Sequence, residues 1–303
     1  MNITRFGRLF GALAACAGIA YSVSPLAAEP ATYPTADAAA AALVEAVQAN
    51  DQPALAKILG SDWRKYIPEG STDQEDVDTF LAGYKERHKI VEDGGTSHLA
   101  VGKNDWTLPM PLVKKGSGWT FDLKAAQEEI RVRRIGRNEL ETEQSILAFY
   151  DAERDYASQD RDGDGVLQYA EKFFSTPGKH DGLYWETKEG EPESPLGALF
   201  VDEASPHGNG GGYHGYNYRI LTAQGPSAPG GAYNYIVGGR MRNGFAAIAW
   251  PIKYGDTGVM SFMVSHDGIV FEKDMGKNGA AAALAMKTFD PDSSWTEVKS
   301  DGE

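Results

Sequence analysis

The chain has 303 residues, of which 42% are hydrophobic and 24% are charged, and its formal net charge is −14. A chain of this length and hydrophobic content predicts two folded domains, because domains of roughly 100 to 150 residues are the commonest. The acidic balance argues against a nucleic-acid-binding protein, since clustered Lys and Arg are needed to meet the phosphate backbone, and it suits counter-cations instead.

The first 28 residues have the layout of a secretory signal peptide. Arg5 and Arg8 precede an apolar run over residues 9–23, and small residues follow as far as Glu29. We expect residues 1–28 to be removed and the mature chain to begin near Glu29. Beyond residue 28 no apolar stretch is long enough for a transmembrane helix, so a periplasmic or secreted protein is predicted.

Cys16 supports an alternative to the export of a soluble chain. Residues 13–16, Leu-Ala-Ala-Cys, fit a bacterial lipoprotein box, in which Cys16 would carry a lipid and anchor the protein to a membrane. Cys16 is the only cysteine. Cleavage near Glu29 would therefore leave a mature chain that cannot form a disulfide.

The mature chain begins with three predicted helices, each with an N-terminal capping signal. They run from Thr35 to Gln48, from Asp51 to Leu59 with Gly60 as a stop, and onward from a capping box made by Thr72 and Glu75. Strands are expected next at residues 99–101, 109–113 and 119–122, the last two joined as a hairpin. Helices then return, with an interruption at Gly136 and a new start capped by Asn138 and Glu141 that runs to about residue 158.

The second half of the chain is rich in short strands. Aromatic and β-branched runs separated by glycine-containing turns predict an antiparallel meander with strands at residues 213–221, 232–237, 245–250, 259–264 and 269–273. A short helix is expected at residues 280–286. The fold class is therefore α+β, with an N-terminal α+β domain (29–158), a loop and irregular connector (159–212) and a C-terminal β-rich domain (213–303).

The strongest chemical motif is DRDGDGVLQYAE at residues 160–171. In an EF-hand loop, positions 1, 3, 5, 7, 9 and 12 supply the calcium ligands and position 6 is a glycine in a sharp turn. Gly165 stands at position 6, and the ligands would be Asp160, Asp162, Asp164, the Val166 carbonyl, Gln168 and Glu171. Calcium suits this set because it is a hard cation that takes six to eight oxygens.

An ordinary acidic turn is the competing interpretation of the same stretch. Gln159 and Lys172 are polar where paired EF-hands usually have apolar flanks, and Pro177 limits the exiting helix to about residues 168–175. Calcium remains the preferred hypothesis because all the constrained positions are filled. The ion would act as a structural clip between the two expected domains.

Several segments resemble one family of secreted bacterial proteins. They are residues 136–139 (GRNE), 175–185 (STPGKHDGLYW), 221–226 (LTAQGP) and 289–295 (FDPDSSW). The chain is similar over nearly all of its mature length to the family catalogued as domain of unknown function 2950. The resemblance implies export and a bacterial source, and it implies no catalytic residues.

Other candidate sites are weaker. His180, His207 and His214 would have to converge to form a zinc site, and loop histidines are more often merely hydrogen-bonded or exposed. Alternating tyrosines after residue 213 could stack on a sugar or peptide, although two-residue spacing more often marks the packed face of a sheet. We therefore predict an exported, calcium-binding, non-catalytic protein that binds an envelope component. The alternative is a hydrolase-type periplasmic enzyme with its site near the three histidines.

Overall fold

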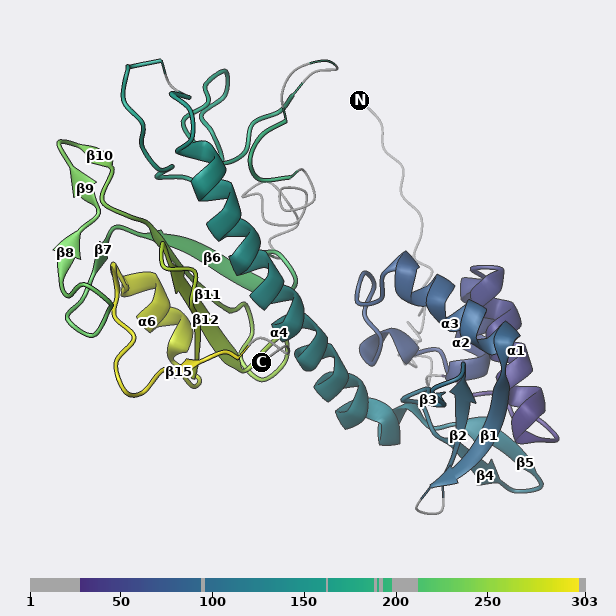
Figure 1. The fold of residues 1–303 in the computed structure, drawn as a ribbon. Coiled ribbons are helices and arrows are strands. Elements are labelled where there is room, and N and C mark those ends of the chain that lie inside the picture. Colours follow the sequence, from purple (N-terminus) through teal and green to yellow (C-terminus); the bar gives the residue numbers. More distant parts are fainter. Residues whose placement is uncertain are drawn as a thin grey trace, which may run out of the picture. The chain divides into compact units, whose positions relative to one another are not determined.

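The structure is a computed structural model that describes residues 28–93, 96–161, 163–187, 190, 193–197 and 212–299 (Figure 1). The fold class is α+β, as predicted. The chain divides into two compact units, the N-terminal unit (Met1–Leu123) and the C-terminal unit (Lys124–Glu303). Residues 1–27 of the predicted signal peptide, Cys16 among them, fall outside the described residues.

The N-terminal unit consists of helices followed by a small antiparallel sheet. Its elements are α1 (Ala36–Gln48), α2 (Gln52–Leu59), the 3-10 turn η1 (Trp63–Lys65), α3 (Gln74–Glu86), β1 (His88–Asp93), β2 (Thr96–Val101), β3 (Trp106–Thr107), β4 (Leu112–Lys115) and β5 (Gly118–Phe121). The strand order is β1-β2-β4-β5, with β3 paired to β2. Leu43 of α1 and Leu99, Leu112 and Phe121 of the sheet are almost fully buried.

Two of the three predicted caps are confirmed. The Thr35 hydroxyl accepts from the Ala38 amide at 3.0 Å, and the Asp51 carboxylate accepts from the Ala54 amide at 3.0 Å. The third prediction is wrong, because α3 starts one residue later than the capping box requires. Asp73 is its N-cap and makes no side-chain capping bond.

The C-terminal unit contains the meander. Its elements are α4 (Leu123–Tyr156), β6 (Tyr216–Leu221), β7 (Ala223–Gln224), β8 (Tyr233–Asn234), β9 (Ile236–Val237), β10 (Arg240–Met241), β11 (Ala246–Pro251), β12 (Met260–Ser265), β13 (Val270–Asp274), α6 (Gly279–Ala285), β14 (Thr288–Phe289) and β15 (Thr296–Glu297). The main sheet has the order β15-β13-β12-β11-β6 and is antiparallel throughout. The predicted meander is confirmed for three strands, because β11, β12 and β13 are neighbours in sequence order. The strand expected at residues 232–237 is divided instead into β8 and β9, which belong to two smaller sheets.

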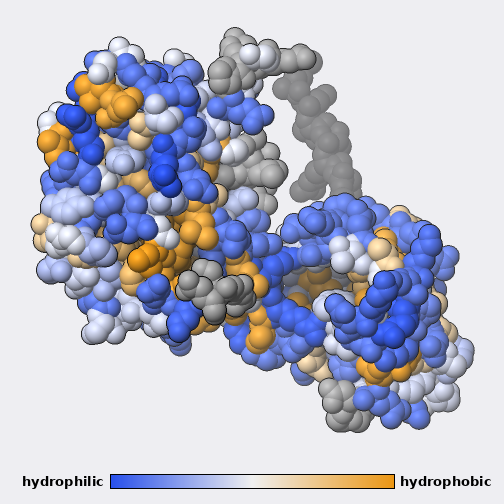
Figure 2. Space-filling view, in the orientation of Figure 1, coloured by the Kyte–Doolittle hydropathy of each residue, from blue (hydrophilic) through white to orange (hydrophobic). Residues whose placement is uncertain are grey.

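The long helix α4 belongs to the C-terminal unit and runs beside its main sheet (Figure 1). Four of its side chains, Ile146, Phe149, Ala152 and Tyr156, enter the same hydrophobic core as β11 and β12. The small helix α6 packs against β11 through Ala283. The face shown in Figure 2 is mostly hydrophilic, with scattered apolar patches.

The interruption expected at Gly136 does not occur, since α4 is one continuous helix of 34 residues. Asn138 does not cap a helix; its side-chain amide donates to the Thr257 carbonyl at 2.8 Å. Because α4 packs on the C-terminal sheet, the chain divides at residue 123 and not at the boundary expected near residue 158. Within the described residues, no helix is long and apolar enough to cross a membrane.

Candidate calcium loop

The DRDGDGVLQYAE stretch follows directly on the end of α4 at Tyr156. All of residues 160–171 are described except Asp162, which is the candidate ligand at position 3. The whole stretch lies inside the C-terminal unit. It therefore does not lie between two compact units, as the expected domain boundaries had placed it.

Asp160 organises the first half of the loop. One carboxylate oxygen accepts from the amides of Gly163 at 2.9 Å and Asp164 at 3.1 Å, and the other accepts from the amide of Gly165 at 2.8 Å. Gly165 has φ of 83°, a left-handed conformation in which a residue with a Cβ is strained. The sharp turn predicted for position 6 is therefore present.

Asp164 is engaged on both of its oxygens. Oδ1 accepts from the Val166 amide at 2.9 Å, and Oδ2 forms an ion pair with the guanidinium of Arg240 on β10. The pair is partly solvent-exposed, so its contribution to stability is modest. Arg240 nevertheless supplies a positive charge beside one of the candidate calcium ligands.

The second half of the loop has no regular secondary structure, and the helix predicted for residues 168–175 is wrong. The backbone amides bond to distant groups in place of helical carbonyls. Tyr169 donates to the Met241 carbonyl at 2.8 Å, and Ala170 donates to the carboxylate of Glu153 at 2.8 Å. Glu171, the candidate ligand at position 12, is exposed.

The donor set contains only oxygens, which fits a hard cation such as calcium. Among the described residues, no group of three or more His, Cys, Asp or Glu side chains could hold a metal ion. Asp162, one of the four carboxylates of the motif, lies outside the described residues.

Glu153 of α4 is a functional candidate that the sequence analysis missed. Its side chain is fully buried, one oxygen accepts from Ala170, and the other has no hydrogen-bond partner among the described residues. Burial raises the pKa of this carboxyl well above its ordinary value, because the charged form is poorly solvated there. Its spacing from Phe149 and Tyr156, four and three residues away on the buried stripe of α4, was the available signal.

The structure describes two of the three histidines of the zinc alternative, and each of these two has another neighbour. The His180 ring stacks on Trp185 with centroids 4.3 Å apart, and His214 Nδ1 lies 2.8 Å from a carboxylate oxygen of Glu141. His207 lies outside the described residues. Two of the three histidines thus have local partners that account for their positions.

The aromatic residues after position 213 are largely core. Tyr216 and Tyr235 are fully buried, which confirms packing as their main role. The Tyr216 hydroxyl donates to the Met260 carbonyl at 2.9 Å, and the Tyr235 hydroxyl donates to Gln224 at 3.0 Å. Burial raises the pKa of Tyr216 above its ordinary range, because the charged form of the side chain is poorly solvated there.

These observations define an α+β protein in which an aspartate-rich loop follows a long helix of the C-terminal unit. The family model described as "Protein of unknown function (DUF2950)" matches residues 30–298, and the chain belongs to this family. The resemblance noted in the sequence is thereby confirmed. Comparisons with curated proteins and with solved structures found no match.

Proposed function

We propose that the protein is an exported, non-catalytic, calcium-binding protein of the bacterial envelope, with the ion held by residues 160–171. The observation that carries the proposal is the convergence of three loop amides on Asp160, together with the left-handed Gly165 at position 6. This local conformation is the one that the first half of a calcium loop needs.

The ion would have a structural role within the C-terminal unit. The loop contacts α4 through Ala170 and Glu153, and it contacts β10 through Asp164 and Arg240. Calcium at Asp160, Asp162, Asp164 and Glu171 would offset the repulsion among four carboxylates within twelve residues. It would thereby stabilise the junction between α4 and β10.

We expect calcium to bind with a dissociation constant of about 10⁻⁴ to 10⁻³ M, the range of extracellular modules. The measurement is terbium luminescence sensitised by Tyr169 and displaced by calcium. Glu171→Gln should weaken binding by roughly tenfold or more, since a bidentate carboxylate is lost from the coordination shell. Glu186→Gln is the matched control, because Glu186 is also exposed and lies outside the loop.

A second readout is thermal stability. Calcium at a hundredfold excess over its dissociation constant should stabilise the wild type by about 2.7 kcal/mol relative to chelator, and Glu171→Gln should lose most of this gain. Equal terbium signals in the two variants, or melting curves that chelator leaves unchanged, would show that the loop is not the site.

The proposed export predicts the residue at which the mature chain starts. The backbone of residue 28 is already fixed, because the Ala28 amide donates to the Ser61 hydroxyl at 2.7 Å, and Glu29 forms an ion pair with Lys115. The intact mass of protein made in a bacterial host should correspond to a chain that begins near Glu29 and carries no lipid. A diacylglyceryl mass on Cys16 would favour the lipoprotein alternative, and retention of Met1 would contradict both.

A further inference from the structure

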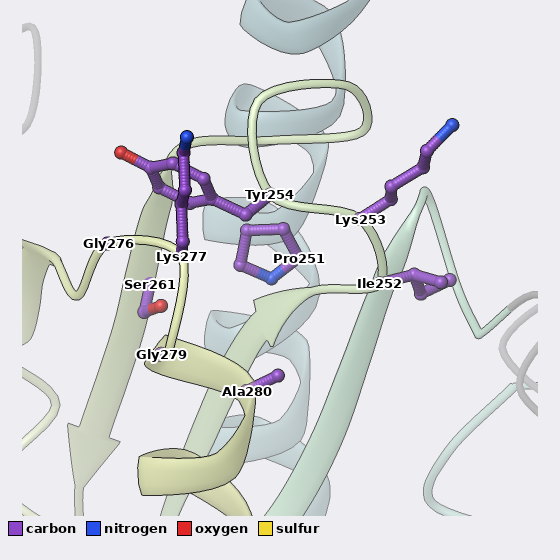
Figure 3. Close-up of a pocket in the computed structure, with 9 residues that line it drawn as sticks. All are labelled: Pro251, Ile252, Lys253, Tyr254, Ser261, Gly276, Lys277, Gly279 and Ala280. Atoms are coloured by element: carbon purple, nitrogen blue, oxygen red, sulfur yellow. The ribbon is translucent and has the colours of Figure 1, made fainter.

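The C-terminal unit contains a cavity with a volume of about 330 Å³, lined by the turn after β11, by Ser261 of β12 and by the segment that leads into α6 (Figure 3). Both signs of charge surround it. Lys277 lines the cavity, and the Asp274 carboxylate accepts from the hydroxyl of the lining Tyr254 at 3.1 Å. Because a site selects its ligand through a few complementary polar groups, these surroundings favour neither an anion nor a cation. The open edge of the N-terminal sheet points more clearly to a partner.

The main path of the N-terminal sheet ends at β1 on one side and at β5 on the other. At β5, the Trp119 amide donates to the Tyr33 carbonyl at 2.7 Å, and the Tyr33 amide donates to the Trp119 carbonyl at 2.8 Å. The segment before α1 therefore covers that edge. At β1, no strand other than β2 pairs with it in the part of the chain that the structure describes. β1 thus presents backbone amides and carbonyls that another strand can bind.

β1 also lacks the features that usually keep an edge strand from pairing. It is six residues long and contains no proline, and its pairing with β2 runs without a bulge. None of residues 88–92 is buried. Its one lysine, Lys89, donates to the Asp105 carboxylate of the same chain at 2.8 Å. The lysine is therefore held on its own chain, and the edge is accessible to another strand.

The hydrogen bonds of the sheet show which groups of β1 point to the open edge. In an antiparallel pair, residues that face each other alternate between those that exchange backbone bonds and those that do not. The Gly102 amide donates to the Arg87 carbonyl at 2.9 Å, one residue before β1 begins at His88. His88 therefore exchanges no backbone bonds with β2, and neither do Ile90 and Glu92. The amides and carbonyls of these three residues point away from β2.

We propose that two copies of the chain dimerise through β1 and form one continuous antiparallel sheet across a two-fold axis. Bonds across this edge must join the outward residues to one another. With Ile90 opposite the partner's Ile90, His88 lies opposite the partner's Glu92, and all three outward residues are paired. A shift by two residues in one direction sets Lys89 opposite the partner's Lys89, and in the other it sets Glu92 opposite the partner's Ile90. Each shift also leaves one outward residue opposite a position outside β1.

The same register pairs complementary side chains. The two Ile90 side chains meet at the axis as a β-branched cross-strand pair. The His88 ring is stacked on Tyr84 with centroids 3.8 Å apart, and its Nδ1 lies 2.9 Å from the Tyr84 carbonyl oxygen. Nε2 makes no hydrogen bond to a described residue, so the charged imidazole can donate from it to the partner's Glu92. The interface contains no residue of the calcium loop, so dimerisation and calcium binding are tested separately.

Sedimentation equilibrium of the mature protein measures the association. We expect a monomer–dimer equilibrium with a dissociation constant of roughly 10⁻⁵ to 10⁻⁴ M, because one strand pair makes a small interface. Ile90→Pro removes an outward amide from each copy and leaves the bonds to β2 in place, so it should weaken the dimer by about tenfold or more. A wild-type protein that stays monomeric up to millimolar concentration would overturn the proposal.

A charge exchange tests the register. Glu92→Lys and His88→Glu each place like charges opposite one another in their own dimers, so each should weaken association by roughly tenfold. An equimolar mixture of the two variants restores both opposite-charge pairs, so a heterodimer should form with close to wild-type affinity. Glu69→Lys is the matched control, because Glu69 is also exposed and lies in the loop before α3. If the mixture fails to associate while circular dichroism shows both variants folded, or if Glu69→Lys weakens the dimer equally, pairing through β1 is wrong.

Discussion

Phe149→Ala should lower the free energy of unfolding of the C-terminal unit by about 3–5 kcal/mol, the usual cost of removing a fully buried aromatic ring. Phe149 is fully buried at the centre of the core that α4 shares with the main sheet. Its ring lies 5.4 Å from that of Phe173 and 5.7 Å from that of Phe245, measured between centroids. The Phe149 ring therefore packs α4 against the segment after the loop and the residue before β11. Its removal would leave a void where these three parts meet.

Leu140→Ala is the control on the same helix. Leu140 is 64% exposed, so its truncation should change the free energy of unfolding by no more than about 0.5 kcal/mol. Hydrogen exchange of the amides in β11 and β12 measures this free energy for the C-terminal unit alone. Losses of similar size in the two variants would contradict the packing of α4 described here.

Glu153→Gln should remove a component of the pH dependence of stability. The folded-state pKa of Glu153 is raised, so between the ordinary pKa of about 4.5 and the folded value the unfolded chain binds fewer protons than the folded one. Stability of the wild type therefore falls as pH rises through that interval, by about 1.4 kcal/mol per pH unit. Glutamine keeps an acceptor for the Ala170 amide and cannot ionise, so the variant should be increasingly more stable than the wild type as pH rises.

The measurement is the same hydrogen exchange, corrected for intrinsic exchange rates, at a series of pH values above 4.5. Glu186→Gln serves as the control, because an exposed glutamate should leave the slope unchanged. Parallel stability curves for the wild type and Glu153→Gln would mean that Glu153 ionises normally in the folded protein.

Local signals predicted the parts of the fold that local physics controls. Thr35 and Asp51 cap helices as expected, and the meander follows from short strands separated by glycine turns. Gly136 was misleading because a glycine in a helix interior costs only about 1 kcal/mol, which neighbouring contacts can offset. Here Asn138 bonds to Thr257, and Glu139 accepts from the amides of Val259 and Met260.

The candidate sites also divide into features set by local sequence and features set by tertiary contacts. Asp160 and Gly165 could be identified because both act within a six-residue turn. The irregular second half of the loop could not be predicted, because its amides bond to Glu153 and Met241, whose proximity depends on the tertiary fold.

The hydrogen bonds at Asp160 bear on what kind of calcium protein the proposal implies. Three loop amides bond to the Asp160 carboxylate, so these hydrogen bonds contribute to the order of the backbone in the first half of the loop. Calcium sensors work by swinging two helices apart, whereas here α4 enters the loop and no helix leaves it over the described residues 163–187. The loop therefore has no second helix that calcium could move over these described residues. It is suited to an ion that stays bound where the calcium concentration is steady, and not to sensing a change in that concentration.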